Sequence, residues 1–149
     1  SRLNHATFLR KLIEEEGIRV VHLGSRAYSK EELEFVRKGK VEVYSARFLK
    51  REQVKLPRLG KVYLSIDVDV FDPSIAPGVS NPEPCGIDFD IFANLLEEVL
   101  RNVDDVVGFD IVEVNPLVDV NDITSLLAAK VGLEIIGMYH KRKVLQELK

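Results

Sequence analysis

Short apolar segments rich in β-branched residues alternate along the chain with segments whose apolar residues recur at helical spacing. Strands that are apolar almost throughout are typical of parallel sheets, because helices cover both faces of such a sheet. The alternation therefore predicts an α/β fold, in which sites form beyond the carboxyl ends of the strands. The expected strands are residues 18–23, 41–44, 62–66 and 106–114, and the expected helices are residues 6–16, 29–36, 88–100 and 122–148, with a further short helix between 47 and 57.

The composition favours a globular chain with a sizeable core, since 46% of the 149 residues are hydrophobic and 30% are charged. A net charge of −3 gives no reason to expect a nucleic-acid partner, because phosphate binding needs a clustered excess of Lys and Arg. We also expect no membrane partner, because no apolar run approaches the roughly 20 residues that span a bilayer. The single cysteine, Cys85, favours a reducing, cytoplasmic location.

Three aspartates, Asp67, Asp69 and Asp72, lie at the carboxyl end of the apolar segment 62–66 and lead into a proline-rich loop, residues 72–86. Residues two apart on an extended strand point to the same side, so Asp67 and Asp69 are expected to converge. Their mutual repulsion favours a divalent cation, and a pair of ions about 3.5–4 Å apart can activate water for hydrolysis. A bare pair of this kind also fits turn formers and a helix cap.

The sequence around these aspartates extends the motif well beyond the pair. It comprises residues 67–78, then Asn81-Pro82-Glu83-Pro84 and Gly86, and later Val112-Glu113-Val114-Asn115-Pro116, residues 122–129, and Asn4-His5 near the front. This pattern closely resembles the signature of the ureohydrolases, the arginase/agmatinase family, and the resemblance covers essentially the whole chain. It implies a three-layer αβα, arginase-like fold with a mainly parallel sheet, and a homo-oligomer, either a trimer or a hexamer.

The resemblance also implies roles for individual residues. Asp67 resembles the carboxylate that bridges two manganese ions, and Asp69 the one that binds a single ion. Glu113 resembles the glutamate that pairs with the substrate guanidinium. The alternative interpretation is that Glu113 is a strand-end residue in an ordinary salt bridge. His5 resembles the histidine that moves protons or orients substrate at the mouth of the site. In the family, water attacks the guanidinium carbon and yields urea and an amine.

The sequence departs from the family pattern in its metal ligands. The remaining ligands of the family lie in a Gly-Gly-Asp-His element and an Asp-Ala-His-x-Asp element, and neither occurs in these residues. We therefore interpret residues 1–149 as the C-terminal part of a single ureohydrolase domain, inactive alone, although a separate chain could also supply the ligands. Asn81 replaces a threonine of many relatives, and Cys85 is interpreted as a small loop residue. Arg26 fits either a residue that positions a neighbouring loop or subunit, or an ordinary surface arginine.

The favoured function is hydrolysis of a linear amidine, with agmatine preferred over arginine because the loop at residues 77–84 and the closing helix look more agmatinase-like. Guanidinobutyrate, proclavaminate and formimidoylglutamate would use the same chemistry. A non-catalytic module that keeps the fold is an alternative from another class. A third is a phosphoryl-transfer enzyme with one Mg²⁺ on the aspartates, which the lack of a glycine-rich phosphate loop disfavours.

Overall fold

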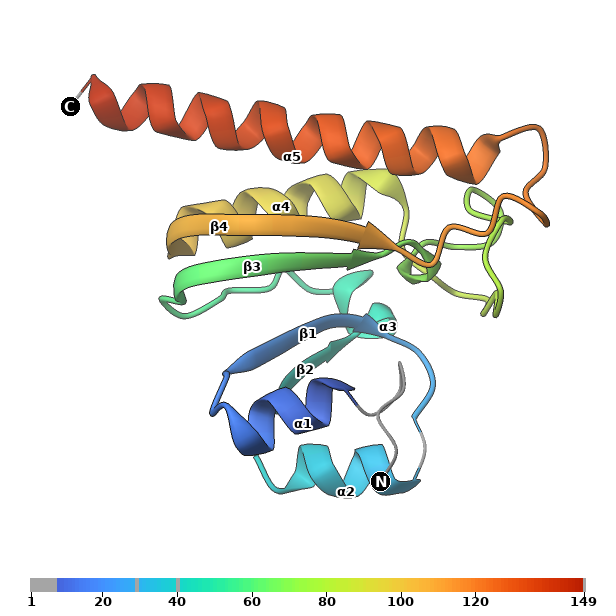
Figure 1. Cartoon of the computed structure of the whole chain (residues 1–149), viewed down its shortest axis with the longest axis horizontal. Helices are drawn as coiled ribbons and strands as arrows, with labels where there is room; N and C mark the ends of the chain where they lie inside the picture. Colours follow the sequence, from blue (N-terminus) through green and yellow to red (C-terminus); the bar gives the residue numbers. More distant parts are fainter. Residues whose placement is uncertain (1–7, 29, 40, 149) are drawn as a thin grey trace.

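The computed structural model describes residues 8–28, 30–39 and 41–148. Two pairs of parallel strands form its framework, and β1 (Val20–Ser25) pairs with β2 (Val41–Ser45), while β3 (Gly60–Asp67) pairs with β4 (Val103–Val112). Figure 1 shows the carboxyl ends of β1, β3 and β4 pointing the same way, with loops gathered beyond β3 and β4. The predicted α/β class with parallel strands is therefore confirmed.

The helices around β1 and β2 are short, and local sequence signals set their limits. Helix α1 (Phe8–Glu15) stops before Gly17, and α2 (Lys30–Arg37) stops before Gly39; both glycines have positive φ, which ends a helix without strain. Helix α3 (Ala46–Leu49) begins at Ser45, whose hydroxyl accepts a hydrogen bond from the backbone N–H of Phe48 at 3.2 Å.

Two longer helices, α4 (Phe89–Asn102) and α5 (Ile123–Glu147), lie together beside the β3–β4 pair (Figure 1). Asp88 caps α4, since its carboxylate accepts a hydrogen bond from the N–H of Ile91 at 2.8 Å. The rings of Phe71 and Phe92, 5.5 Å apart, join the loop after β3 to α4. The largest fully buried apolar side chains of this half are those of Val68, Phe71, Ile87, Val103, Val131 and Ile135.

The observed elements differ from the predicted ones mainly at their ends. Strand β4 begins three residues earlier than expected and stops at Val112, because Glu113 adopts a left-handed backbone with φ of 68°. Residues 123–147 form one continuous helix. Among the described residues the strands form two two-stranded sheets, because β1 and β3 do not pair with each other. None of the helices in the described ranges is both long enough and apolar enough to cross a membrane.

Candidate functional site

The first candidate residue, Asp67, ends β3 and starts a single 3₁₀ turn, η1 (Val68–Val70). One carboxylate oxygen of Asp67 accepts a hydrogen bond from the N–H of Asp69 at 3.0 Å, while the fully buried Val68 anchors the turn in the core. Asp67 and Asp69 do converge, but the predicted cause, alternation along an extended strand, is wrong. Asp69 is not extended, and the turn brings the two carboxylates together; Asp67 is also the helix cap considered from the sequence.

The electrostatics of Asp67 reflect crowding of negative charge. Burial raises the pKa of Asp67 from 3.8 to about 6, and the nearby carboxylates of Asp69 and Glu113 act in the same direction, although the hydrogen bond from Asp69 N–H opposes them. A carboxylate in this environment gains from a cation that replaces its lost solvation. The structure thus brings three of the predicted site residues into one electrostatic cluster.

Glu113 reaches this cluster through the pairing of the two strands. In the parallel register Asp67 lies beside Val112, so the next residue, Glu113, emerges at the same end of the sheet. Its positive φ of 68° is unfavourable for a residue with a Cβ, at a cost of about 1–3 kcal/mol. Its side chain is exposed. A strained, exposed carboxylate beside two partly buried ones is suited to meeting a cationic ligand.

The loop that follows η1 is held against the end of β3 by backbone contacts. The N–H of Asp72 donates to the carbonyl of Ile87 at 2.9 Å, and the N–H of Ile87 donates to the carbonyl of Val70 at 3.0 Å. A Cβ on Gly86 would lie 2.3 Å from the backbone of Phe71 and Asp72, so only glycine allows this approach. The third aspartate, Asp72, is a turn former, because its carboxylate accepts two hydrogen bonds from Ser74.

The far part of the same loop is fixed to the beginning of α5 and to the segment after β4. The buried N–H of Gly78 donates to the hydroxyl of Thr124 at 2.6 Å, and the carbonyl of Gly78 accepts from the N–H of Asn115 at 2.8 Å. The amide side chain of Asn115 donates to Ser80 Oγ at 3.1 Å. These hydrogen bonds therefore tie the loop to the segment that directly follows Glu113.

Asp119, a residue that our sequence reasoning missed, caps α5. Its carboxylate accepts hydrogen bonds from the N–H groups of Thr124 and Ser125 at 3.0 and 2.9 Å. Burial alone would raise the pKa of Asp119, but these hydrogen bonds outweigh it and lower that pKa below its usual range. Asp122, the first residue of the predicted helix, has a left-handed backbone and makes no side-chain capping bond in the described structure. The sequence did not predict this cap, because Asp119 is five residues before Thr124, whereas an ordinary N-cap residue bonds an N–H two or three residues further on.

Arg26, which the sequence left open between two roles, lies at the end of β1 and reaches across to η1. Its guanidinium donates to the carbonyl and to Oδ1 of Asp69, the latter at 3.1 Å, and to the carbonyl of Glu83. The side chain is only 10% exposed, which excludes an ordinary surface arginine. A signal in the sequence was its position directly after a strand, where functional side chains gather in parallel sheets.

Two further loop residues and one terminal residue complete the set. Cys85 is exposed, lies in the loop at a φ of 69°, and is a free thiol. Asn81 is exposed in the same loop. His5, the predicted proton-transfer residue, lies outside the described residues.

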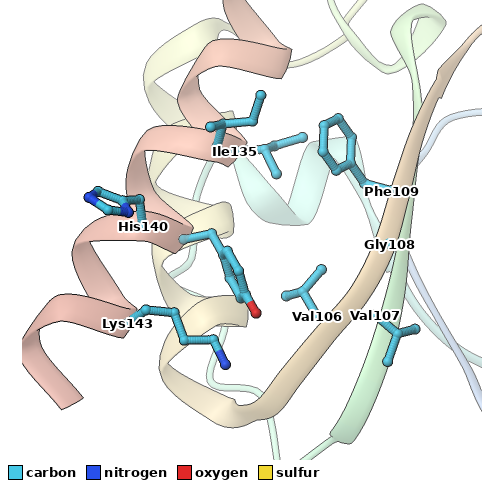
Figure 2. Close-up of a pocket in the computed structure, with 9 residues that line it drawn as sticks. Val106, Val107, Gly108, Phe109, Ile135, His140 and Lys143 are labelled. Carbon is cyan, nitrogen blue, oxygen red and sulfur yellow. The ribbon is translucent and has the colours of Figure 1, made fainter. Parts of the chain in front are cut away.

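A pocket of about 350 Å³ lies between β4 and α5 (Figure 2). It is lined by Val106, Val107, Gly108, Phe109, Ile135, Ile136, Tyr139, His140 and Lys143. Its walls are mostly apolar. It borders residues 106–109 of β4, whereas Asp67 and Glu113 lie at the carboxyl end of the strands. This pocket is therefore separate from the carboxylate cluster.

Asp67 and Asp69 both offer carboxylate oxygens, which suit a hard divalent cation, and the partly buried position of Asp67 disfavours uncompensated charge. Within the described ranges, however, no three histidine, cysteine or acidic side chains are arranged to hold a metal ion.

Comparison with known proteins identifies the family. The model of the Arginase family matches residues 1–137. The mitochondrial arginase of Medicago truncatula is 42% identical over 130 residues, which cover 83% of this chain and 38% of the arginase. The N(1)-aminopropylagmatine ureohydrolase of Thermus thermophilus is 38% identical over 118 residues, covering 76% and 40% of the two chains. The solved structure of the agmatine ureohydrolase of Thermoplasma volcanium superposes with a TM-score of 0.77 at 34% identity, covering 93% and 48%.

These matches show that the chain belongs to the arginase family of hydrolases and has the arginase/agmatinase fold. The chain spans 38–40% of the length of the two curated relatives. That share agrees with the predicted partial match to the family.

Proposed function

We propose that the full-length gene product hydrolyses a linear guanidino compound, with agmatine favoured, to urea and an amine with the help of two Mn²⁺ ions. The observation that carries this proposal is the placement of Asp67 and Asp69 at the carboxyl end of β3, with Glu113 following the paired end of β4. The family match supports the class of reaction. The preference for agmatine rests on the loop and closing helix of the sequence, and on similarity to two relatives whose names include agmatine or aminopropylagmatine.

Each candidate residue has a chemical task in this reaction. Asp67 and Asp69 would hold the metal ions together with ligands from outside the described residues, and Mn²⁺, when bound, would lower the pKa of a water molecule. Glu113 has two carboxylate oxygens that match two N–H donors of a guanidinium group. The water oxygen adds to the guanidinium carbon, and the bond from that carbon to the nitrogen of the substrate chain breaks. His5 would move the proton that the departing amine takes up.

Arginine is the second candidate substrate, because the mitochondrial arginase of Medicago truncatula is 42% identical over the matched region. The carboxylate cluster would serve either compound, since both carry the same guanidinium group. The difference between them lies in the substrate tail, an α-amino acid group in arginine and a simple amine in agmatine.

The test is urea release from agmatine and from arginine by the full-length, Mn²⁺-loaded protein. We expect a higher kcat/KM for agmatine, and the reverse order would replace agmatine by arginine. Asp67→Ala and Asp69→Ala should each lower kcat/KM by more than about 100-fold, because loss of a metal ligand exceeds the 10–100-fold effect of losing a residue that supports one. The matched control is Cys85→Ala in the exposed loop, which should leave kcat/KM unchanged. Metal binding without urea from either compound would favour another amidine or a non-catalytic module.

We also propose a homo-oligomer, a trimer or a hexamer, on the strength of the family resemblance. Light scattering coupled to size-exclusion chromatography of the full-length protein measures this directly. A monomer at micromolar concentration would contradict the proposal.

A further inference from the structure

We infer that Arg26 is a positioning residue for the proposed metal ligand Asp69, and that it fixes this carboxylate and the loop at Glu83 in a single arrangement. The inference rests on the proposed function, because it assigns a purpose to a contact with a proposed ligand. It adds the residue that directly follows β1, which is distant in the sequence from the aspartate motif.

The hydrogen bonds of Arg26 all go to the segment that carries the site. One terminal nitrogen donates to the carbonyl and to Oδ1 of Asp69, and the other donates to the carbonyl of Glu83 and lies 3.5 Å from the carbonyl of Phe71. A planar guanidinium presents donors in a fixed fork, so these bonds together define the orientation of the Asp69 carboxylate. A lysine, with a single nitrogen, cannot satisfy the acceptors on both sides.

The backbone of β1 is shaped to deliver this side chain. Gly24 has a φ of 101°, and a Cβ at this position would lie 2.3 Å from Cγ2 of Val70, so the strand end is pressed against η1. The register between β1 and β2 shifts between Leu23 and Ser25, an irregularity that redirects the chain. The following residue, Arg26, then extends along the turn with only 10% of its side chain exposed.

Two effects of Arg26 on metal binding oppose each other, and their balance makes the inference testable. Its positive charge repels a cation held by Asp69, so charge alone predicts that removing it raises the affinity for Mn²⁺. Its hydrogen bonds hold the ligand in place, and losing a residue that orients a metal ligand typically lowers metal affinity about 10–100-fold. The sign of the change therefore separates positioning from simple electrostatics.

The experiment uses the full-length protein with the variants Arg26→Gln and Arg26→Lys. The matched control is Arg19→Gln, which alters an arginine that is 57% exposed, adjoins the same strand and pairs with Glu42. Mn²⁺ binding is titrated by electron paramagnetic resonance, and urea release is followed as a function of Mn²⁺ concentration. Circular dichroism establishes that the variants are folded.

We expect Arg26→Gln to weaken binding at one Mn²⁺ site by about 10-fold or more, with Arg26→Lys in between and Arg19→Gln unchanged. The half-activating Mn²⁺ concentration should rise in parallel, while kcat at saturating Mn²⁺ recovers toward the wild-type value. A purely structural role would lower kcat at every Mn²⁺ concentration and would overturn the inference. Unchanged or tighter Mn²⁺ binding in folded Arg26→Gln would overturn it as well. A wild-type protein that binds Mn²⁺ but releases no urea contradicts the proposed function alone, and one that binds no Mn²⁺ contradicts both.

Discussion

The hydrogen bond between Gly78 and Thr124 offers a sharp test of how the site loop is held. Thr124 is fully buried, and its hydroxyl accepts the buried N–H of Gly78 at 2.6 Å. Thr124→Val keeps the shape of the side chain but removes the acceptor, which leaves a buried donor unpaired. Such a loss costs about 1–3 kcal/mol, equivalent to about a 5- to 150-fold increase in opening of the loop.

Hydrogen exchange of the Gly78 amide in the full-length protein measures this opening locally. We expect its exchange rate to rise by about 5- to 150-fold in Thr124→Val. The control, Thr124→Ser, keeps the hydroxyl and loses only one methyl group, so Gly78 should stay protected while global stability falls by about 1 kcal/mol. Unchanged exchange in Thr124→Val, or equal effects of the two variants at Gly78, would refute the reasoning.

Three further predictions concern the carboxylate cluster and its loop. Glu113→Gly should leave the melting temperature unchanged or raise it, because glycine removes the left-handed strain, while kcat/KM for agmatine falls; a lower melting temperature would contradict this. Gly86→Ala should cost about 1–3 kcal/mol in denaturant unfolding, since its Cβ would meet backbone at 2.3 Å, whereas Gly137→Ala, facing open space in the described structure, should stabilise by about 1 kcal/mol. For Asp67 the folded pKa of about 6 exceeds the unfolded value of 3.8, so the metal-free folded state holds the proton more tightly and its stability declines as pH rises from about 4 to 6. Asp67→Asn should remove this pH-dependent part of the stability. Curves of melting temperature against pH that run parallel for the two proteins would contradict the prediction.

The fold class was accessible from the sequence because strands and helices in this chain have strong local signals. Gly17 and Gly39 end two helices at positions with positive φ, and Asp88 caps α4. The limits of β4 were predicted less well. Its end depends on the backbone conformation of Glu113, and a glutamate carries no local preference for the left-handed region.

The cap of α5 shows why some features escape sequence reasoning. Asp122 directly precedes the first residue of α5, but Asp119 makes the capping hydrogen bonds, because the chain between them turns back toward the first turn of the helix. The same carboxylate would lie only 2.6 Å from a Cβ on Gly78, so the loop and the helix start constrain each other. Such a relation exists only after residues distant in the sequence have packed together.

The sequence by itself determined the α/β class, the family resemblance and the aspartate motif, because periodicity and residue spacing are properties of short segments. Only the tertiary structure decided how the site residues meet. The 3₁₀ turn, rather than strand alternation, brings Asp69 beside Asp67, and the parallel register of β3 and β4 places Glu113 next to them. Arg26 joins the group from β1 because Gly24 allows that strand to approach η1. The physical reason is that hydrogen bonding and burial act between neighbours in space, whereas sequence patterns report mainly on neighbours along the chain.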